Sequence, residues 1–387
     1  MKEGWKYKKL GDVIDHLRTG LNPRTHFKLN TPDSTGYYIT VRELKGFTIE
    51  PDEKTYKVNS TAIIRINERS NLKIGDVLFS GTGTIGKTAL VSELPDNWNI
   101  KEGVYAMTPK HSELDSKYFI YYIGSDFFLR LVNDKAAGTG VRSIPMKELV
   151  KLPISVPSLS EQKSIVDYLD SAFAKIDAMK ANAEKALNEA KALFQASLKE
   201  MLEPKDGWEE STFGDVCWYK RNNGVHKGTR YIGMEHIEQG TGKLLGTISS
   251  DEVLSNTFAF NKGDVLYGRL RPYLKKVIVA DFDGCCSTEI FPIQSQKIIA
   301  PFLMYWFLTD VITNKVNATC AGCRMPRGNM NDVLKFLISY PTIKEQQNIV
   351  DVLDAIKSKV DRLQENFDKI SQECDALKQA ILKQVFE

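Results

Sequence analysis

The stretch that decides the fold is PSLSEQKSIVDYLD at residues 157–170, which recurs as PTIKEQQNIVDVLD at residues 341–354. In each copy a hydroxyl residue, Ser158 or Thr342, precedes a glutamate by three positions. This pattern predicts a capping box, in which the hydroxyl and the carboxylate satisfy the first free backbone N–H groups of a helix. Each copy therefore marks the start of a helix.

Apolar and small residues continue through both segments at alternating spacings of four and three residues. A spacing that averages 3.5 residues over several heptads predicts coiled-coil packing. Each helix would hold about 43 residues and span roughly 64 Å. The positions that we expect to form the interface between the two helices include Ile165, Leu169, Ile176, Ile349, Leu353, Ile356, Val360, Leu363 and Phe367.

The repeat extends over nearly the whole chain. The opening Trp5 followed by LGDV at residues 10–13 returns as Trp208 followed by FGDV at 213–216, and GDVLF at 75–79 returns as GDVLY at 263–267. Similarity is lost between these two turns, over residues 19–71 in the first copy and 220–259 in the second. A duplicated frame with unlike inserts predicts one scaffold that presents two different reading surfaces.

A chain of 387 residues exceeds the size of most single domains. The expected boundaries are a first domain at 1–157, a central helix at 158–203, a second domain at 204–341 and a C-terminal helix at 342–387. The two domains carry net charges of +5 and +2, from 23 Lys+Arg against 18 Asp+Glu and from 16 against 14, whereas each helical segment carries −2. A mildly basic globular surface suits nucleic acid. The sequence shows no signal peptide and no apolar stretch long enough to cross a bilayer, so we expect a cytoplasmic protein without membrane contact.

Within each domain, short runs rich in β-branched and aromatic residues predict strands at 37–42, 62–66, 76–80, 88–92, 264–267, 276–280 and 289–293. Apolar and aromatic spacing predicts one helix over residues 116–133 and its counterpart over 300–317. The expected fold class is α+β, with two similar globules that contain twisted sheets.

The sequence GTGTIGKT at residues 81–88 matches a phosphate-binding loop. A true loop of this kind leads into a helix, but the following ALVSELP at 89–95 is short and β-like. The equivalent turn in the second repeat, GRLRPYLKK at 268–276, keeps positive charge and loses the glycines. Both copies are therefore predicted to be basic hairpins.

The remaining motifs do not predict catalysis. Cys320 and Cys323 have the spacing of a redox or zinc site that Cys285 and Cys286 could complete, but the first repeat contains no cysteine. The histidines show no metal-ligand spacing, and neither an amino-methyltransferase motif nor an acidic nuclease cluster is evident. We expect no catalytic residue, no metal and no cofactor in this chain.

The ordered, duplicated set of motifs resembles the specificity (S) subunit of type I restriction–modification systems. Its carriers are the openings at 4–13 and 207–216, the hairpins at 75–87 and 263–276, and the closing signature at 157–170 and 341–354. The resemblance implies two target recognition domains, each reading one half of a split site in double-stranded DNA. It also implies that the two helices pack antiparallel about a pseudo-twofold, set the spacer and dock two methyltransferase (M) subunits. The helix positions named above, from Ile165 to Phe367, are therefore candidates for the M-subunit interface as well as for the interface between the helices. Those partners would carry S-adenosylmethionine, and motor or nuclease (R) subunits, where present, would use ATP.

Bases are read by side chains on their edges in the major groove, with arginine favouring guanine and asparagine favouring adenine. The unlike inserts and the basic loops supply such groups. Our candidate DNA-binding residues are Arg24, His26, Arg42, Arg65, Arg69, Lys87, Arg142, Arg221, Asn222, Asn223, His226, Lys227, Arg230, Arg269, Arg271, Lys275, Arg324 and Arg327.

Two other functions compete with this one. A phosphate-loop NTPase would bind ATP when alone, and a coiled-coil scaffold with two protein-binding domains would have no affinity for DNA. Co-purification with a methyltransferase separates the specificity subunit from both.

Overall fold

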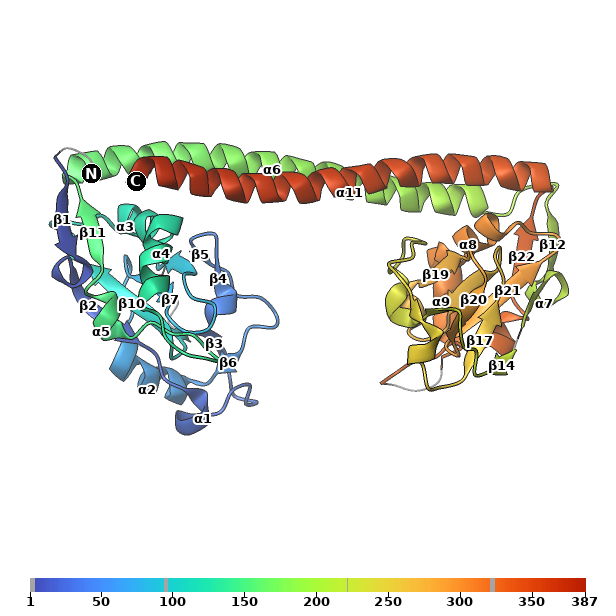
Figure 1. The fold of residues 1–387 in the computed structure, drawn as a ribbon, viewed down its shortest axis with the longest axis horizontal. Coiled ribbons are helices and arrows are strands. Elements are labelled where there is room, and N and C mark those ends of the chain that lie inside the picture. The colour runs from blue at the N-terminus through green and yellow to red at the C-terminus, as the bar shows by residue number, and fades with distance from the viewer. Residues whose placement is uncertain (1–3, 94–96, 221, 321–323) are drawn as a thin grey trace. The chain divides into compact units, whose positions relative to one another are not determined.

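The computed structural model describes residues 4–93, 97–220, 222–320 and 324–387. It divides into two compact units, the first formed by residues up to 181 together with 369–387, and the second by residues 182–368. Each unit contains a globular domain and one segment from each of two long helices, α6 (Leu159–Leu202) and α11 (Ile343–Phe386) (Figure 1). The predicted fold class, two similar α+β domains with two long helices, is confirmed.

Each long helix holds 44 residues and begins at the predicted signature. The hydroxyl of Ser158 accepts a hydrogen bond from the Glu161 amide at 3.3 Å, and that of Thr342 accepts one from the Glu345 amide at 3.4 Å. The contacts of the Glu161 and Glu345 carboxylates differ from those of the expected capping box. These carboxylates accept hydrogen bonds from the indoles of Trp5 and Trp208, so they connect each helix to the first residues of its domain.

In unit 1 the two helical segments are antiparallel. Lys180 lies 3.9 Å from Asp375, whereas Asp177, one turn earlier on α6, pairs at 2.6 Å with Lys378, which lies later on α11. In unit 2 the corresponding segments meet through the hydrogen bond from Lys191 to Gln364 at 2.8 Å.

The predicted interface positions line these seams to different degrees. Leu169, Ile176, Ile349 and Leu353 are buried in the two main cores, Ile165, Ile356 and Val360 pack against those cores, and Leu363 and Phe367 are half-buried. The apolar stripe thus joins the helices to the domains as well as to each other.

The repeated frame is visible strand by strand. In unit 1, β1 (Lys6–Lys9) pairs with β11 (Pro153–Val156), and the main sheet has the order β2 (Ile14–Thr19), β10 (Val104–Pro109), β7 (Val77–Ser80), β8 (Thr88–Leu90). In unit 2, β12 (Glu209–Thr212) pairs with β22 (Leu337–Tyr340), and the sheet has the order β13 (Cys217–Tyr219), β21 (Ile290–Ser295), β18 (Val265–Gly268), β19 (Val277–Val279). Neighbours in both sheets are antiparallel. The two domains are therefore copies of one frame.

The unlike inserts have different secondary structures. Both domains contain a parallel pair, β3 (Gly36–Ile39) with β9 (Trp98–Ile100) and β15 (Arg230–Ile232) with β20 (Gly284–Ser287). In unit 1 the sheet is completed by β6 (Lys57–Val58), and helix α2 (Ser60–Ser70) packs against β9. In unit 2 strands β16 (Ile248–Ser249), β17 (Thr257–Phe260) and β14 (Asn223–Gly224) extend the sheet, and β17 pairs with β20. A helix thus packs against β9 in one insert, whereas a strand pairs with the equivalent β20 in the other.

Short elements complete the domains. They are α1 (Pro23–His26), β4 (Leu44–Lys45), β5 (Thr48–Ile49) and α5 (Met146–Leu149) in unit 1, and α7 (Phe213–Val216) and α10 (Met330–Val333) in unit 2.

The prediction of a strand at residues 62–66 is wrong, because this segment lies inside α2. The side chain of Asn59 accepts a hydrogen bond from the Ala62 amide at 3.0 Å and so caps the helix. Ala62, Ile63 and Ile66 are buried at a helical spacing. Packing of this face overrides the strand preference of the β-branched isoleucines.

The single helices predicted at 116–133 and 300–317 are each two helices. In unit 1 these are α3 (Ser116–Ile123) and α4 (Asp126–Lys135), and in unit 2 they are α8 (Ala300–Leu308) and α9 (Asp310–Ala318). The breaks fall at Ser125 and Thr309, whose hydroxyls cap the second helix by accepting from the amides of Phe128 and Ile312. In each unit the first helix lies between the main sheet and the long helices (Figure 1).

Candidate nucleic-acid interface

The repeated Glu-Gln signature anchors each long helix to its domain. The Gln162 amide is fully buried, accepts a hydrogen bond from the Asp115 amide at 2.8 Å and donates to the carbonyls of Glu113 and Pro157. Gln346 makes the equivalent set in unit 2, with the Ile299 amide at 2.9 Å and two carbonyls. The signature that identified the repeat is therefore structural.

A second repeated contact involves a tyrosine and the final aspartate of the signature. Tyr121 donates to Asp170 at 2.5 Å, and Tyr305 donates to Asp354 in unit 2. Burial, followed by the neighbouring carboxylate, raises the pKa of both phenols. Partial burial raises the pKa of Asp170, but hydrogen bonds from Lys117 and Tyr121 outweigh it and lower that pKa overall. Each helix therefore has a fixed attachment to α3 or α8.

The aspartates of the Gly-Asp-Val turns are also structural. Asp76 is fully buried, pairs with Arg18 at 2.8 Å and accepts from the Lys73 amide at 2.7 Å. Asp264 is 2% exposed and accepts from the Asn261 amide at 2.9 Å and from the Gln294 side chain at 2.5 Å. Through these contacts the two carboxylates hold the turn before β7 or β18.

The phosphate-loop sequence forms a β-hairpin between β7 and β8. Lys87 donates its backbone N–H to the Ser80 hydroxyl at 2.8 Å, and Thr88 is buried in β8. In a phosphate loop the threonine would begin a helix and face a magnesium ion. The hairpin therefore does not have the architecture of an NTPase site, and the exposed Lys87 side chain projects from a turn.

A hollow lies at the same place of the repeated frame in both units. In the main sheets Val104 pairs with Ser80 and Ile290 pairs with Gly268, so Tyr105 and Phe291, one residue further, are equivalent. Tyr105 lines a hollow of about 600 Å³ in unit 1, and Phe291 lines one of about 530 Å³ in unit 2. The residues two positions before the paired ones, Glu102 and Thr288, also line them. The frame thus presents two equivalent concave surfaces, which we call the first and second hollow.

The first hollow is basic. Arg24 from α1, Arg69 from α2 and Lys101 after β9 line it together with the polar Asn22 and Thr82. Arg24 and Lys101 also line an adjoining depression of about 550 Å³ that includes Lys28. Such guanidinium and ammonium groups suit guanine edges and phosphates.

The second hollow is lined mainly by neutral hydrogen-bonding groups, namely Asn223, Ser255, Asn256 and Thr288. Phe258 and Phe291 also line it, and among the described residues Arg269 is its one lining cation. The Arg269 guanidinium donates to Glu289 at 2.9 Å and lies 5.3 Å from the ring centroid of Phe291. Asparagine amides suit adenine edges, so the two hollows differ in the chemistry that they offer to a base.

The hairpin arginines of unit 2 converge on one carboxylate. Glu289 accepts from Arg269 at 2.9 Å and from Arg327 at 2.7 Å. Partial burial raises the pKa of Glu289, but the hydrogen bonds from Arg327 and Arg269 outweigh it, so this pKa lies below its usual value. Two candidate DNA contacts therefore also fix the loop between α9 and α10 against the hairpin.

The structure separates the other predicted site residues into groups. Several make contacts inside their own domain: Arg42 pairs with Glu43, Lys227 donates to three carbonyls of residues 250–253, Arg230 stacks on Phe282, Lys275 pairs with Asp310, and His226 contacts Thr257. Arg65 and Arg142 donate to the carbonyls of His26 and Asn133. His26 contains a buried Nδ1 atom without a hydrogen-bond partner among the described residues. The remaining candidates in the described ranges are exposed: Arg24, Arg69, Lys87, Asn222, Asn223, Arg271 and Arg324. Arg221 lies outside the described residues.

Sequence reasoning missed Lys28, Lys101 and Asn256 in these surfaces. Lys101 follows a three-residue strand and lies opposite Leu21 in an isolated bridge. The position of Lys101 directly after a strand was the sequence signal that could have identified it.

The described residues contain no group of three or more His, Cys, Asp or Glu side chains placed to hold a metal ion. Burial raises the pKa of the Cys217 thiol to about 12 and also raises that of Cys286. Cys323, the second cysteine of the predicted pair, lies outside the described residues. No helix in the described ranges is long and apolar enough to cross a membrane.

Two copies of one frame, each with segments of both long helices and with unlike polar hollows at the equivalent place, define a two-domain protein built on an internal repeat. The chain belongs to the family of the type I restriction modification DNA specificity domain, whose model matches residues 2–189 and 205–372. The resemblance to specificity subunits predicted from the repeated motifs is confirmed.

Relatives of this family match most of the chain, and solved structures share its fold. The chain is 25% identical to the type I restriction enzyme EcoDI specificity subunit of Escherichia coli, over 99% of this chain and 88% of that protein. It is 24% identical to the putative MjaX specificity subunit of Methanocaldococcus jannaschii, over 92% and 87%. In fold it is similar to a chain solved in work on assembly and conformational transition of the type I R-M system, with a TM-score of 0.72 at 18% identity over 100% and 98%. The HsdS subunit from Thermoanaerobacter tengcongensis gives 0.51 at 18% identity over 100% and 97%.

Proposed function

We propose that this chain reads a bipartite, asymmetric site in double-stranded DNA for a type I restriction–modification assembly. The first domain would read one half-site and the second domain the other. The observation that carries the proposal is the pair of hollows, which occupy equivalent places in the frame but are lined by different side chains. A palindromic site would require two alike surfaces.

In this proposal the chain recognises DNA and performs no chemistry. Two methyltransferase subunits, which would bind S-adenosylmethionine, dock on the long helices, and an ATP-driven motor or nuclease subunit is a further expected partner. The absence of a phosphate-loop helix after residues 81–88 and the structural roles of Asp76 and Asp264 support a non-catalytic chain. A cytoplasmic location follows from the same proposal, since chromosomal DNA is the ligand.

The proposal is tested by exchanging the chemistry of one hollow at a time. The chain is expressed with its methyltransferase partner, and methylated adenines are mapped across the genome. Arg24→Ala combined with Arg69→Ala should relax the half-site read by the first domain, and Asn223→Ala combined with Asn256→Ala should relax the other. One lost base contact costs about 1–3 kcal/mol of discrimination, a change of roughly 5- to 150-fold in preference.

Lys6→Ala is the matched control, because it removes an exposed charge of the first domain on β1, outside the hollow. This variant should keep both half-sites. If the first pair of substitutions relaxes both half-sites equally, or neither, the hollows are not the reading surfaces. If the wild-type chain shows no affinity for DNA and its methyltransferase partner shows no DNA-dependent activity, a protein-binding scaffold would be favoured instead.

A further inference from the structure

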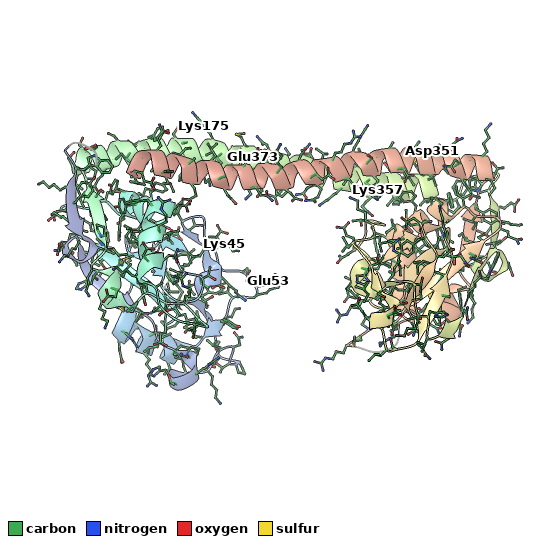
Figure 2. All side chains as sticks on the ribbon, viewed as in Figure 1. Lys45, Glu53, Lys175, Asp351, Lys357 and Glu373 are labelled. Carbon is green, nitrogen blue, oxygen red and sulfur yellow. The ribbon has the colours of Figure 1, made fainter. Side chains whose placement is uncertain are left out.

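Both unlike inserts reach back to a long helix through a hairpin. In unit 1 the hairpin β4–β5 carries Phe47, which follows Lys45 (labelled in Figure 2) by two residues. In unit 2 the hairpin closed by the hydrogen bond from the Glu238 amide to the Lys243 carbonyl at 2.9 Å carries Lys243. Each residue contacts a helix segment of its own unit.

The contact in unit 1 is aromatic. The ring of Phe47 meets Tyr121 edge-on at 5.2 Å between centroids and lies parallel to Phe173 of α6 at 6.3 Å. The rim of the ring lies close to Gly124, where an added Cβ would be 2.5 Å from Cε1 of Phe47. We call Phe47, Tyr121 and Phe173 the aromatic clasp.

The backbone of Phe47 has a φ of +75°, which is unfavourable for a bulky residue. Such a conformation persists where the surroundings determine it. Here the Phe47 carbonyl accepts from the Leu90 amide at 2.9 Å, while the ring is held on α6. The hairpin is therefore fixed from both sides, by the main sheet and by the helix.

The contact in unit 2 is ionic. The Lys243 ammonium lies 2.9 Å from one carboxylate oxygen of Asp361 on α11, and Lys357, labelled in Figure 2, lies 3.5 Å from the other. The preceding Gly242 packs so closely that a Cβ there would lie 2.9 Å from the Met304 sulfur. We call Lys243, Asp361 and Lys357 the ionic clasp.

The helix residues of the two clasps are equivalent positions of the repeat. Phe173 and Asp177 correspond to Lys357 and Asp361 at the offset of 184 that relates the two signatures. In unit 1, Asp177 pairs with Lys378 of the other long helix at 2.6 Å, so it is not available to the hairpin. In unit 2, the same position faces the insert. The chemistry of the helix position thus matches the chemistry of the insert that reaches it.

We propose that Phe47 and Lys243 are positioning residues that fix each insert on its own helix, one by a contact that resists salt and the other by a contact that salt weakens. Ion pairs at partly exposed sites are screened by salt, whereas apolar contacts are not. The side chains of Lys243 and Asp361 are 41% and 27% exposed, so salt reaches the ionic clasp. This consequence rests on the proposed function: reading of the second half-site loosens before reading of the first as salt rises.

The clasps are tested on the full chain by amide hydrogen exchange at 50 mM and 1 M NaCl. The reporting amides are Glu50 and Leu90 beside the aromatic clasp, and Glu238 and Leu245 beside the ionic one, all of which donate hydrogen bonds at the hairpins. High salt should speed exchange at Glu238 and Leu245 by roughly two- to fivefold, as expected for a partly exposed ion pair. The exchange rates of the Glu50 and Leu90 amides should change with salt no more than those of exposed amides on the long helices.

Variants separate positioning from general stability. Lys243→Met should show the fast exchange at both salt concentrations, and Lys243→Arg should keep the salt response. Phe47→Leu should speed exchange at Leu90 at both concentrations without creating a salt response. Equal salt responses at both hairpins, or a wild-type salt response in Lys243→Met, would overturn the proposal.

A second measurement keeps the clasps distinct from DNA reading. Methylation by the assembled complex is followed on duplexes with one mismatch in either half-site, and Lys243→Met should raise tolerance of mismatches in the second half-site alone. If salt changes hydrogen exchange at the unit 2 hairpin alone but no bipartite DNA site is found, the proposed clasps are supported and the proposed function is refuted. A bipartite site with unchanged tolerance in Lys243→Met would refute their role in positioning.

Discussion

The buried Gln162 amide offers the sharpest test of how each domain is attached to its helix. Gln162→Leu keeps a similar volume but removes three hydrogen bonds, one from the Asp115 amide and two to the carbonyls of Glu113 and Pro157. A buried partner left unsatisfied costs about 1–3 kcal/mol, and the lower half of that range applies because two of these bonds are only partly buried. The expected loss is therefore about 3–6 kcal/mol in unit 1. In a domain of this size that lowers the melting temperature by roughly 6–24 °C.

The measurement is thermal unfolding of the full chain, with hydrogen exchange to assign the transition to unit 1. Gln347→Leu is the matched control, because Gln347 is exposed on α11 and donates only to Asp351 one turn away. That change should cost about 0.5 kcal/mol or less. If Gln162→Leu costs no more than this control, the glutamine does not anchor the helix and our reading of the signature is wrong.

Three further predictions concern unit 2 and the hairpins. Arg271→Ala should weaken DNA binding on all sequences and reduce the slope of log affinity against log salt by about one, measured by titration at several salt concentrations; a changed sequence preference at constant slope would make Arg271 a base reader. Because the pKa of Glu289 is lowered in the folded state, its contribution to stability is present above its usual value of 4.5 and is lost as pH falls through the lower folded value. Glu289→Gln should therefore destabilise unit 2 at pH 7 and flatten its stability between about pH 5 and pH 3 in urea titrations, and a wild-type pH profile would contradict the Arg269–Glu289–Arg327 pairing. The purified chain should hydrolyse no ATP, so Lys87→Ala should leave an ATPase assay unchanged. ATP hydrolysis that this substitution abolishes would instead support a phosphate-loop NTPase.

The frame could be predicted from the sequence because its determinants are local and duplicated. The signature at 157–170 and 341–354 sets the helix starts, and the heptad spacing sets the buried face. A duplicated motif is informative even when each copy is weak. The same comparison rejected the phosphate loop, since only one copy carried its glycines.

The inserts were less predictable because their structure depends on packing partners distant in sequence. Residues 62–66 have the composition of a strand, yet they form a helix because α2 covers β9. The helix breaks at Ser125 and Thr309 depend on single hydroxyl caps inside otherwise continuous apolar patterns.

The sequence predicted which types of residue form the candidate site, but not which other side chains these residues contact. Arg269 and Arg327 have the composition of DNA contacts, but Glu289, which is 20 and 38 positions away, engages both. Lys101 was missed because its importance depends on the meeting of β9 with α1 and α2 at one hollow. Charge in a sequence identifies possible contacts, whereas only the fold shows which charges are already paired.

The central claim is that one frame presents two unlike reading surfaces, and the DNA site itself tests it most directly. The measurement is a genome-wide map of adenine methylation made by the wild-type chain with its methyltransferase partner. The account predicts a non-palindromic motif of two unlike half-sites separated by a spacer of fixed length and free sequence. A palindromic motif, or one continuous run of specified bases, would contradict it.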